Sequence, residues 1–138
     1  MICRIKSYIR LGSKKRQLLQ EAALSLLAVR ILLLFLPVRY ALRISTSGTK
    51  NNSEQLIAEL QNVKWAILKA DRVVFWKSNC LIKSISGRWM LQRRGIESKI
   101  SFGIRKSNHE KVTAHAWLKV NDVEIVERGE NYIELETF

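Results

Sequence analysis

Apolar positions are densest near the N-terminus, in the stretch from Leu18 to Leu36. Alanine and leucine dominate this stretch, no glycine interrupts it, and Pro37 follows it. Because Ala and Leu favour helix and Pro blocks its continuation, the pattern predicts a helix that ends near Pro37. The polar residues Gln20, Glu21 and Arg30 make it a marginal membrane span, and no small-residue cleavage site follows, so a secretory signal is not expected. We expect this helix to pack on the domain or a partner subunit, with contact to a membrane surface as the alternative.

A polar, turn-rich linker over residues 45–53 separates this segment from a second apolar pattern. From Glu54 to Asp71, apolar residues recur at spacings of three and four, which is typical of one face of a helix. Ser53, followed by Glu54 and Gln55, can cap this helix. The apolar positions are Leu56, Ile57, Leu60, Val63, Ala66, Ile67 and Ala70.

A third helix is predicted to begin near Cys80. Ser78 and Asn79 are good N-caps, and an apolar face continues until Arg93-Arg94-Gly95, where glycine can end a helix. Cys80 is then at a helix N-terminus, where free N–H groups and the helix dipole favour a thiolate and could hold an oxyanion. The alternative is that Cys80 is a small buried apolar residue.

Alternating apolar and polar positions after this helix predict an antiparallel sheet. The expected strands cover residues 99–105, 112–120, 123–127 and 132–138, with a polar loop over 106–111 and a turn at Asn121-Asp122. In the second strand Ala114, Ala116 and Leu118 share one face, so His115 lies on the opposite face with Thr113 and Trp117.

A helix that begins with a cysteine, followed by a hairpin with a histidine and an acid, is the arrangement that a papain-type or transglutaminase-like site requires. The imidazole takes the thiol proton and the acid orients the imidazole. His109 is a second candidate for the base, but it lies in the polar loop, so His115 is favoured.

Charge and cysteine content narrow the classes of partner and compartment. The 138 residues carry 24 Lys and Arg against 12 Asp and Glu, a net charge of +12, which fits nucleic acid, an anionic membrane or an acidic peptide. No nucleic-acid-reading motif accompanies the basic groups, so nucleic acid is not favoured. Two cysteines, Cys3 and Cys80, are too few for a disulfide framework or a Cys-based zinc cage, which favours a reducing compartment.

Four motifs in order resemble the stand-alone leader peptidases (B-type maturation proteases) of lasso-peptide biosynthesis, in the transglutaminase-like superfamily. They are Trp76-Lys-Ser-Asn-Cys80-Leu, Leu91-Gln-Arg-Arg-Gly-Ile96, Phe102-Gly-Ile and Ala114-His-Ala-Trp117. Leu36-Pro37-Val38-Arg39 resembles the N-terminal segment of those proteins, so the likeness covers nearly the whole chain.

The resemblance implies a cysteine protease that removes the leader from a ribosomally made precursor peptide, with Cys80 as nucleophile and His115 as base. It also implies two partners, a leader-binding recognition protein and an ATP-dependent lasso cyclase, and it implies no cofactor. The expected location is cytoplasmic, with membrane association as an addition. The alternative function is a non-catalytic, basic, membrane-associated or peptide-binding module of the same fold.

The third catalytic residue departs from the resemblance, because the family usually has an Asp where this chain has Glu127. Asp122, at the turn, is about 20 Å from His115 at roughly 3.3 Å per strand residue, so it is expected to be a turn residue only. An ideal two-residue loop would pair 116 with 127 and put Glu127 on the wrong face, so a longer loop or a bulge that pairs 117 with 127 is required. Glu127 is the predicted orienting residue, with a backbone carbonyl or no third group as the alternative.

The predicted fold is therefore α+β: N-terminal helices and a transglutaminase-like, papain-like core in which a Cys-bearing helix packs on an antiparallel sheet. One domain is expected over residues 1–138, made of an apolar and basic helical segment (1–44), a linker (45–53) and a catalytic core (54–138).

Overall fold

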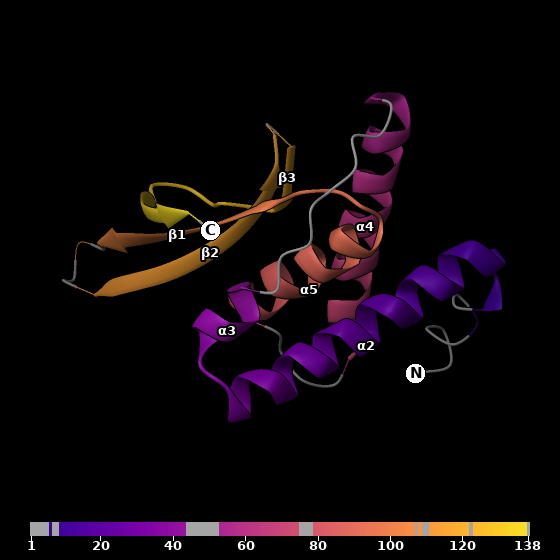
Figure 1. The fold of residues 1–138 in the computed structure, drawn as a ribbon, viewed down its shortest axis with the longest axis horizontal. Helices are drawn as coiled ribbons and strands as arrows, with labels where there is room; N and C mark the ends of the chain where they lie inside the picture. Colours follow the sequence, from indigo (N-terminus) through magenta and orange to yellow (C-terminus); the bar gives the residue numbers. More distant parts are fainter. Residues whose placement is uncertain are drawn as a thin grey trace.

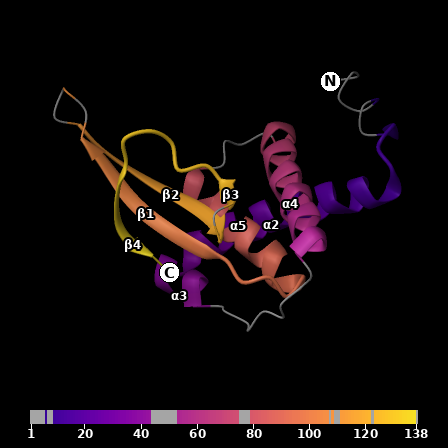
Figure 2. The same cartoon turned by 90° about the horizontal axis from the view of Figure 1, so that it is seen from above.

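The structure is a computed structural model, and it describes residues 6, 9–43, 53–74, 79–106, 108, 111–121 and 123–137. Among the elements whose bounds the structure describes, four helices precede four strands. They are α2 (Ser13–Phe35), α3 (Val38–Arg43), α4 (Ser53–Val73), α5 (Cys80–Arg93), β1 (Lys99–Lys106), β2 (Val112–Val120), β3 (Val123–Val126) and β4 (Ile133–Thr137). The strands form one antiparallel sheet in the order β3-β2-β1-β4 (Figures 1 and 2), so the predicted α+β class is confirmed.

The helices follow the apolar pattern closely. α2 begins at Ser13, five residues before the predicted start, and ends at Phe35 because Leu36 is extended before Pro37. α4 begins at Ser53, and the other positions of the predicted linker lie outside the described residues.

α5 forms the centre of the molecule, between the sheet and α2 (Figure 1). Its residues Ile82, Ile85, Met90 and Leu91 join one core with the inner faces of α2 and α4. Gly87 lets the helix approach the sheet closely, because a Cβ there would lie 2.7 Å from Leu118 Cδ2. The position of α5 is thus set by packing on both of its sides.

Gly95 ends α5 as the sequence predicted. It has a φ of +70°, and the amides of Gly95 and Ile96 bond the carbonyls of Gln92 and Leu91, which is a Schellman arrangement. This left-handed turn reverses the chain so that β1 begins four residues later.

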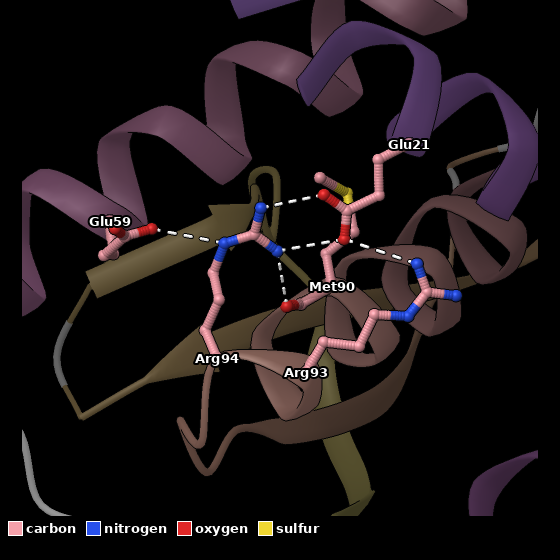
Figure 3. A network of polar contacts seen from close by, with 5 residues as sticks. All are labelled: Glu21, Glu59, Met90, Arg93 and Arg94. Atoms are coloured by element: carbon pink, nitrogen blue, oxygen red, sulfur yellow. Dashed lines mark hydrogen bonds and ion pairs between the residues drawn. The ribbon is translucent and has the colours of Figure 1, made fainter. Parts of the chain in front are cut away.

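A charged network fixes the same end of α5 to the two neighbouring helices (Figure 3). Arg94 makes a bidentate pair with Glu21 of α2, at 3.0 and 2.8 Å, and its Nε lies 3.2 Å from a carboxylate oxygen of Glu59 on α4. It also donates to the carbonyl of Met90 at 2.8 Å. The Arg94 hydrogen bond is the main cause that holds the pKa of Glu21 below its usual value, and the same bond raises the pKa of Arg94.

By length and composition, α2 is the one helix in the described part of the chain that could cross a membrane. Its side chains Leu19, Ala22, Ser25, Leu26 and Val29 are nevertheless buried inside the molecule. One face of α2 therefore packs on the rest of the domain, which is the arrangement that the sequence favoured.

Candidate active site

Cys80 is the first residue of α5, at the predicted helix start. Asn79 is the N-cap, and its Oδ1 accepts a hydrogen bond of 3.0 Å from the amide of Ile82. A capped first turn has a fixed geometry, so the Cys80 side chain leaves the helix in a defined direction. The thiol is free of any disulfide and half-buried.

The thiol reaches the sheet at the residue next to His115. The amide of Ala116 donates a hydrogen bond of 3.4 Å to Cys80 Sγ. The packing of α5 on β2 therefore brings Cys80, 35 residues earlier in the chain, to the level of His115 on the strand. The N–H group aimed at the sulfur would also stabilise negative charge on it.

His115 is half-buried and has a main-chain partner. Its Nε2 lies 2.7 Å from the carbonyl oxygen of Glu127. A carbonyl can only accept, so this bond requires the proton on Nε2 and leaves the lone pair of the neutral ring on Nδ1. Nδ1 is thus the nitrogen that can accept a proton.

Glu127 contacts His115, but through its backbone rather than its side chain. The register has the predicted bulge: Val120 pairs with Val123, yet Leu118 pairs with Val126, so β3 contains one extra residue. This shift brings Glu127 to the level of Trp117. Its carboxylate is 76% exposed and lies 3.7 Å from Lys64 Nζ, so the carbonyl alternative is the contact that the structure contains.

Two aromatic rings flank the imidazole and were not assigned a role from the sequence. The His115 ring stacks with Trp117 at 6.2 Å between centroids and lies 5.0 Å from the ring of Tyr132. Gly103 pairs with His115 across the sheet, and a Cβ there would lie 2.7 Å from the Trp117 ring. A glycine in mid-strand opposite the candidate base was the signal for this close approach.

Two arginines lie against the aromatic rings that flank His115. The guanidinium carbon of Arg128 lies 5.2 Å from the centre of the Trp117 ring, and that of Arg105 lies 5.0 Å from the Tyr132 ring. Arg128 also donates to the carbonyl of Tyr132. These contacts tie the loop between β3 and β4, which contributes the Glu127 carbonyl, to the aromatic rings beside His115.

Several candidates from the sequence fall outside the described residues: Cys3, Ser78, His109 and Asp122. In the portion that the structure does describe, no group of three or more His, Cys, Asp and Glu side chains could hold a metal ion.

The site combines a helix that begins with a cysteine, a strand that carries a histidine, and the antiparallel hairpin that this strand forms. This arrangement agrees with the comparison to protein families. The family model described as the transglutaminase-like superfamily matches residues 23–136. The chain belongs to this superfamily. The match covers all of the site and begins inside α2, so it contains α4 and α5 completely and the second half of α2. No significant match was found among curated proteins or among solved structures.

Membership in the transglutaminase-like superfamily, which includes cysteine proteases, agrees with the geometry at Cys80 and His115. Transglutaminase-like catalysis of this kind transfers an acyl group to the cysteine and then to water or an amine.

Proposed function

We propose that this chain is a cysteine peptidase that removes the leader from a lasso-peptide precursor, with Cys80 as nucleophile and His115 as general base. The observation that carries the proposal is the hydrogen bond from the Ala116 amide to Cys80 Sγ, at the residue next to His115. The Nε2 of His115 is hydrogen-bonded to a main-chain carbonyl, which leaves Nδ1 free to act as the base. The order of the four sequence motifs supplies the substrate class.

The proposed chemistry uses Cys80 and His115 in turn. His115 Nδ1 takes the thiol proton, and the thiolate attacks the carbonyl carbon of the scissile peptide bond. The amide of Cys80, the first of α5, would then be positioned for the oxyanion. The C–N bond breaks as His115 returns the proton to the leaving amine, and water, deprotonated by His115, hydrolyses the thioester and restores the thiol.

The edge of β2 beside the thiol favours a peptide as substrate. Among the described strands, only β3 pairs with β2 on this side, and it does so only from Leu118 to Val120. Because the Ala116 amide points to this side, strand alternation turns the N–H and C=O of Ala114 the same way. An extended peptide could pair with Ala114 and so present its carbonyl to Cys80.

The leader-binding recognition protein and the ATP-dependent cyclase remain proposed partners. The first would supply the leader affinity, and the second would close the ring on the released core. The peptidase would then act on a peptide that is held by another protein, which lowers the affinity that its own cleft must provide.

The test is cleavage of a cognate precursor with the recognition protein present, read by mass spectrometry. We expect a leader and a core whose masses add up to the precursor plus one water, and no product with the folded Cys80→Ala protein. A thioester trapped between Cys80 and the leader would identify the acyl-enzyme directly.

Three outcomes would contradict the proposal. Full cleavage by the Cys80→Ala protein would exclude a cysteine mechanism. Leader joined to an added amine, with no hydrolysis, would indicate a transferase. Tight precursor binding without any reaction would favour the non-catalytic module.

A further inference from the structure

The outer face of α2 carries an apolar stripe that no other part of the described chain covers. The exposed side chains follow one side of the helix at spacings of three and four residues. They are Leu24, Leu27, Ile31, Leu34 and Phe35, which we call the α2 stripe. Exposure is highest at the end of the helix, with 75% at Leu34 and 81% at Phe35, and a contiguous exposed patch of large apolar residues marks an interaction surface.

The opposite face of α2 packs against the rest of the domain. Leu26 and Val29 are fully buried, and Glu21 is paired with Arg94 of α5. A helix held in this way cannot cross a bilayer without breaking these contacts. Any surface that meets the α2 stripe must therefore lie alongside the helix.

Charge around the stripe is almost entirely positive. Residues 9–43 contain seven basic residues and a single acidic one, Glu21, which Arg94 neutralises. Lys14 and Arg16 are exposed at the N-terminal end of α2, before the stripe, and Arg39 is exposed just after it, next to the exposed ring of Tyr40. An open hollow bordered by Leu24, Ala28 and Arg93 adds apolar surface on the same side.

We propose that the α2 stripe docks on the surface of an anionic lipid bilayer, with α2 lying in the plane of the interface. An apolar helix face with basic and aromatic residues at its ends is the combination that inserts its side chains among acyl chains and its cations among phosphates. A second copy fits less well, because a two-fold contact would bring the two basic rims together.

The geometry leaves the candidate active site open in the docked state. α2 lies on the side of α5 that faces away from the sheet (Figures 1 and 2). A bilayer against the α2 stripe would then leave the β2 edge at Ala116 accessible to a peptide. Docking would place a peptidase, or a binding module, at the membrane without blocking it.

The test is co-sedimentation with phosphatidylcholine vesicles that contain or lack phosphatidylglycerol. We expect wild-type protein to bind the anionic vesicles at least about tenfold more tightly, with binding weakened by salt. Leu34→Gln/Phe35→Gln should lose at least about tenfold in affinity, because Gln keeps helix propensity and removes the inserting side chains.

The matched control is Ile57→Gln/Leu68→Gln on α4, where the wild-type side chains are 55% and 45% exposed. This variant should bind as the wild type does. Should the stripe variant not fold, Lys14→Gln/Arg16→Gln changes two exposed cations and should weaken binding and reduce its salt dependence.

Absence of wild-type binding to anionic vesicles, or equal binding by the stripe variant, would overturn the proposal. Stripe-dependent dimerisation, or stripe-dependent association with a protein partner, without vesicle binding would also overturn it. Cys80→Ala should bind as the wild type does, so this result is independent of the peptidase assignment.

Discussion

The two ends of α5 use polar groups in opposite ways. At the C-terminal end, Arg94 is saturated by Glu21, Glu59 and the Met90 carbonyl. At the N-terminal end, Cys80 is half-buried and has one long hydrogen bond, from the amide of Ala116. One end of the helix is an anchor, and the other carries the thiol that we propose as the nucleophile.

The two ends of α5 therefore divide the work of fixing the helix and of presenting the candidate site at the sheet edge. A nucleophile such as the one proposed at Cys80 needs open space for substrate, so it cannot be fixed by many partners of its own. Rigidity is supplied instead by packing along α5 and by the charged cluster about one helix length away. Activity and stability should therefore separate between variants at the two ends.

Loss of the proposed base should change the cleavage rate more than any other substitution discussed below. His115→Ala should lower precursor cleavage by about 10³-fold or more, because the thiol loses its base, while the thermal stability changes little. Cleavage rate and melting temperature measure the two quantities. Thr113→Ala, an exposed position two residues away on the same strand face, is the control and should keep its rate. Equal rates for both variants would remove His115 from the mechanism.

At the anchored end, stability should fall and chemistry should persist. Arg94→Ala should cost about 2–3 kcal/mol of unfolding free energy, since it removes charged hydrogen bonds and leaves Glu21 partly buried. Arg93→Ala is matched in residue type, but its side chain is 60% exposed and meets Glu21 only at 3.4 Å, so about 0.5 kcal/mol or less is expected. Denaturant unfolding of both variants tests this, and equal losses would contradict the anchor.

Acid should loosen the anchor. The pKa of Glu21 is lowered in the folded state, chiefly by its hydrogen bond to Arg94, so its stabilisation is present above the ordinary value of 4.5 and is lost as the pH falls through the lower folded value. Glu21→Gln should be less stable than wild type by about 1–2 kcal/mol near neutral pH and should lose less on acidification. Melting temperatures from about pH 6 to about pH 3 measure this; parallel curves for the two proteins would contradict it.

The cap of α5 should link stability to activity. Asn79→Ala should cost about 1 kcal/mol, because the amide of Ile82 loses its partner, and should also slow cleavage by loosening the first turn around Cys80. Asn79→Ser can restore a capping oxygen and should recover most of both effects. If Asn79→Ala slows cleavage and Asn79→Ser does not restore the rate, the side-chain amide of Asn79 would have a role beyond capping the helix.

The smallest expected effect is at Glu127. Because the contact to His115 is made by the main-chain carbonyl and the carboxylate lies near Lys64, Glu127→Gln should keep the cleavage rate within about threefold of wild type. Steady-state kinetics with the precursor measure it. A loss approaching that of His115→Ala would show that the carboxylate orients the imidazole during reaction.

Most of the element boundaries were predictable from local sequence. Gly95 marked the end of α5, Asn79 marked its start, and the strand predicted from Val112 to Val120 has the same bounds as β2. Each of these signals depends on neighbours within a few positions of the chain, namely caps, left-handed turns and the two-residue period of a strand. For Glu127 to reach the level of His115, register arithmetic required either a longer loop or a bulge, and β3 contains a bulge.

Local sequence was enough to predict the α+β class, to name Cys80 and His115 as candidates, and to show that Glu127 needs a longer loop or a bulge to reach His115. Packing between distant segments sets the other features: α5 presents Cys80 to the Ala116 amide, a carbonyl rather than a carboxylate contacts His115, and no other described residue covers the outer face of α2. These features depend on contacts between residues far apart in the chain, and on whether a backbone or a side chain turns inward at a bulge. Local spacing does not encode either choice, because both follow from how the packed helices and the sheet fit together.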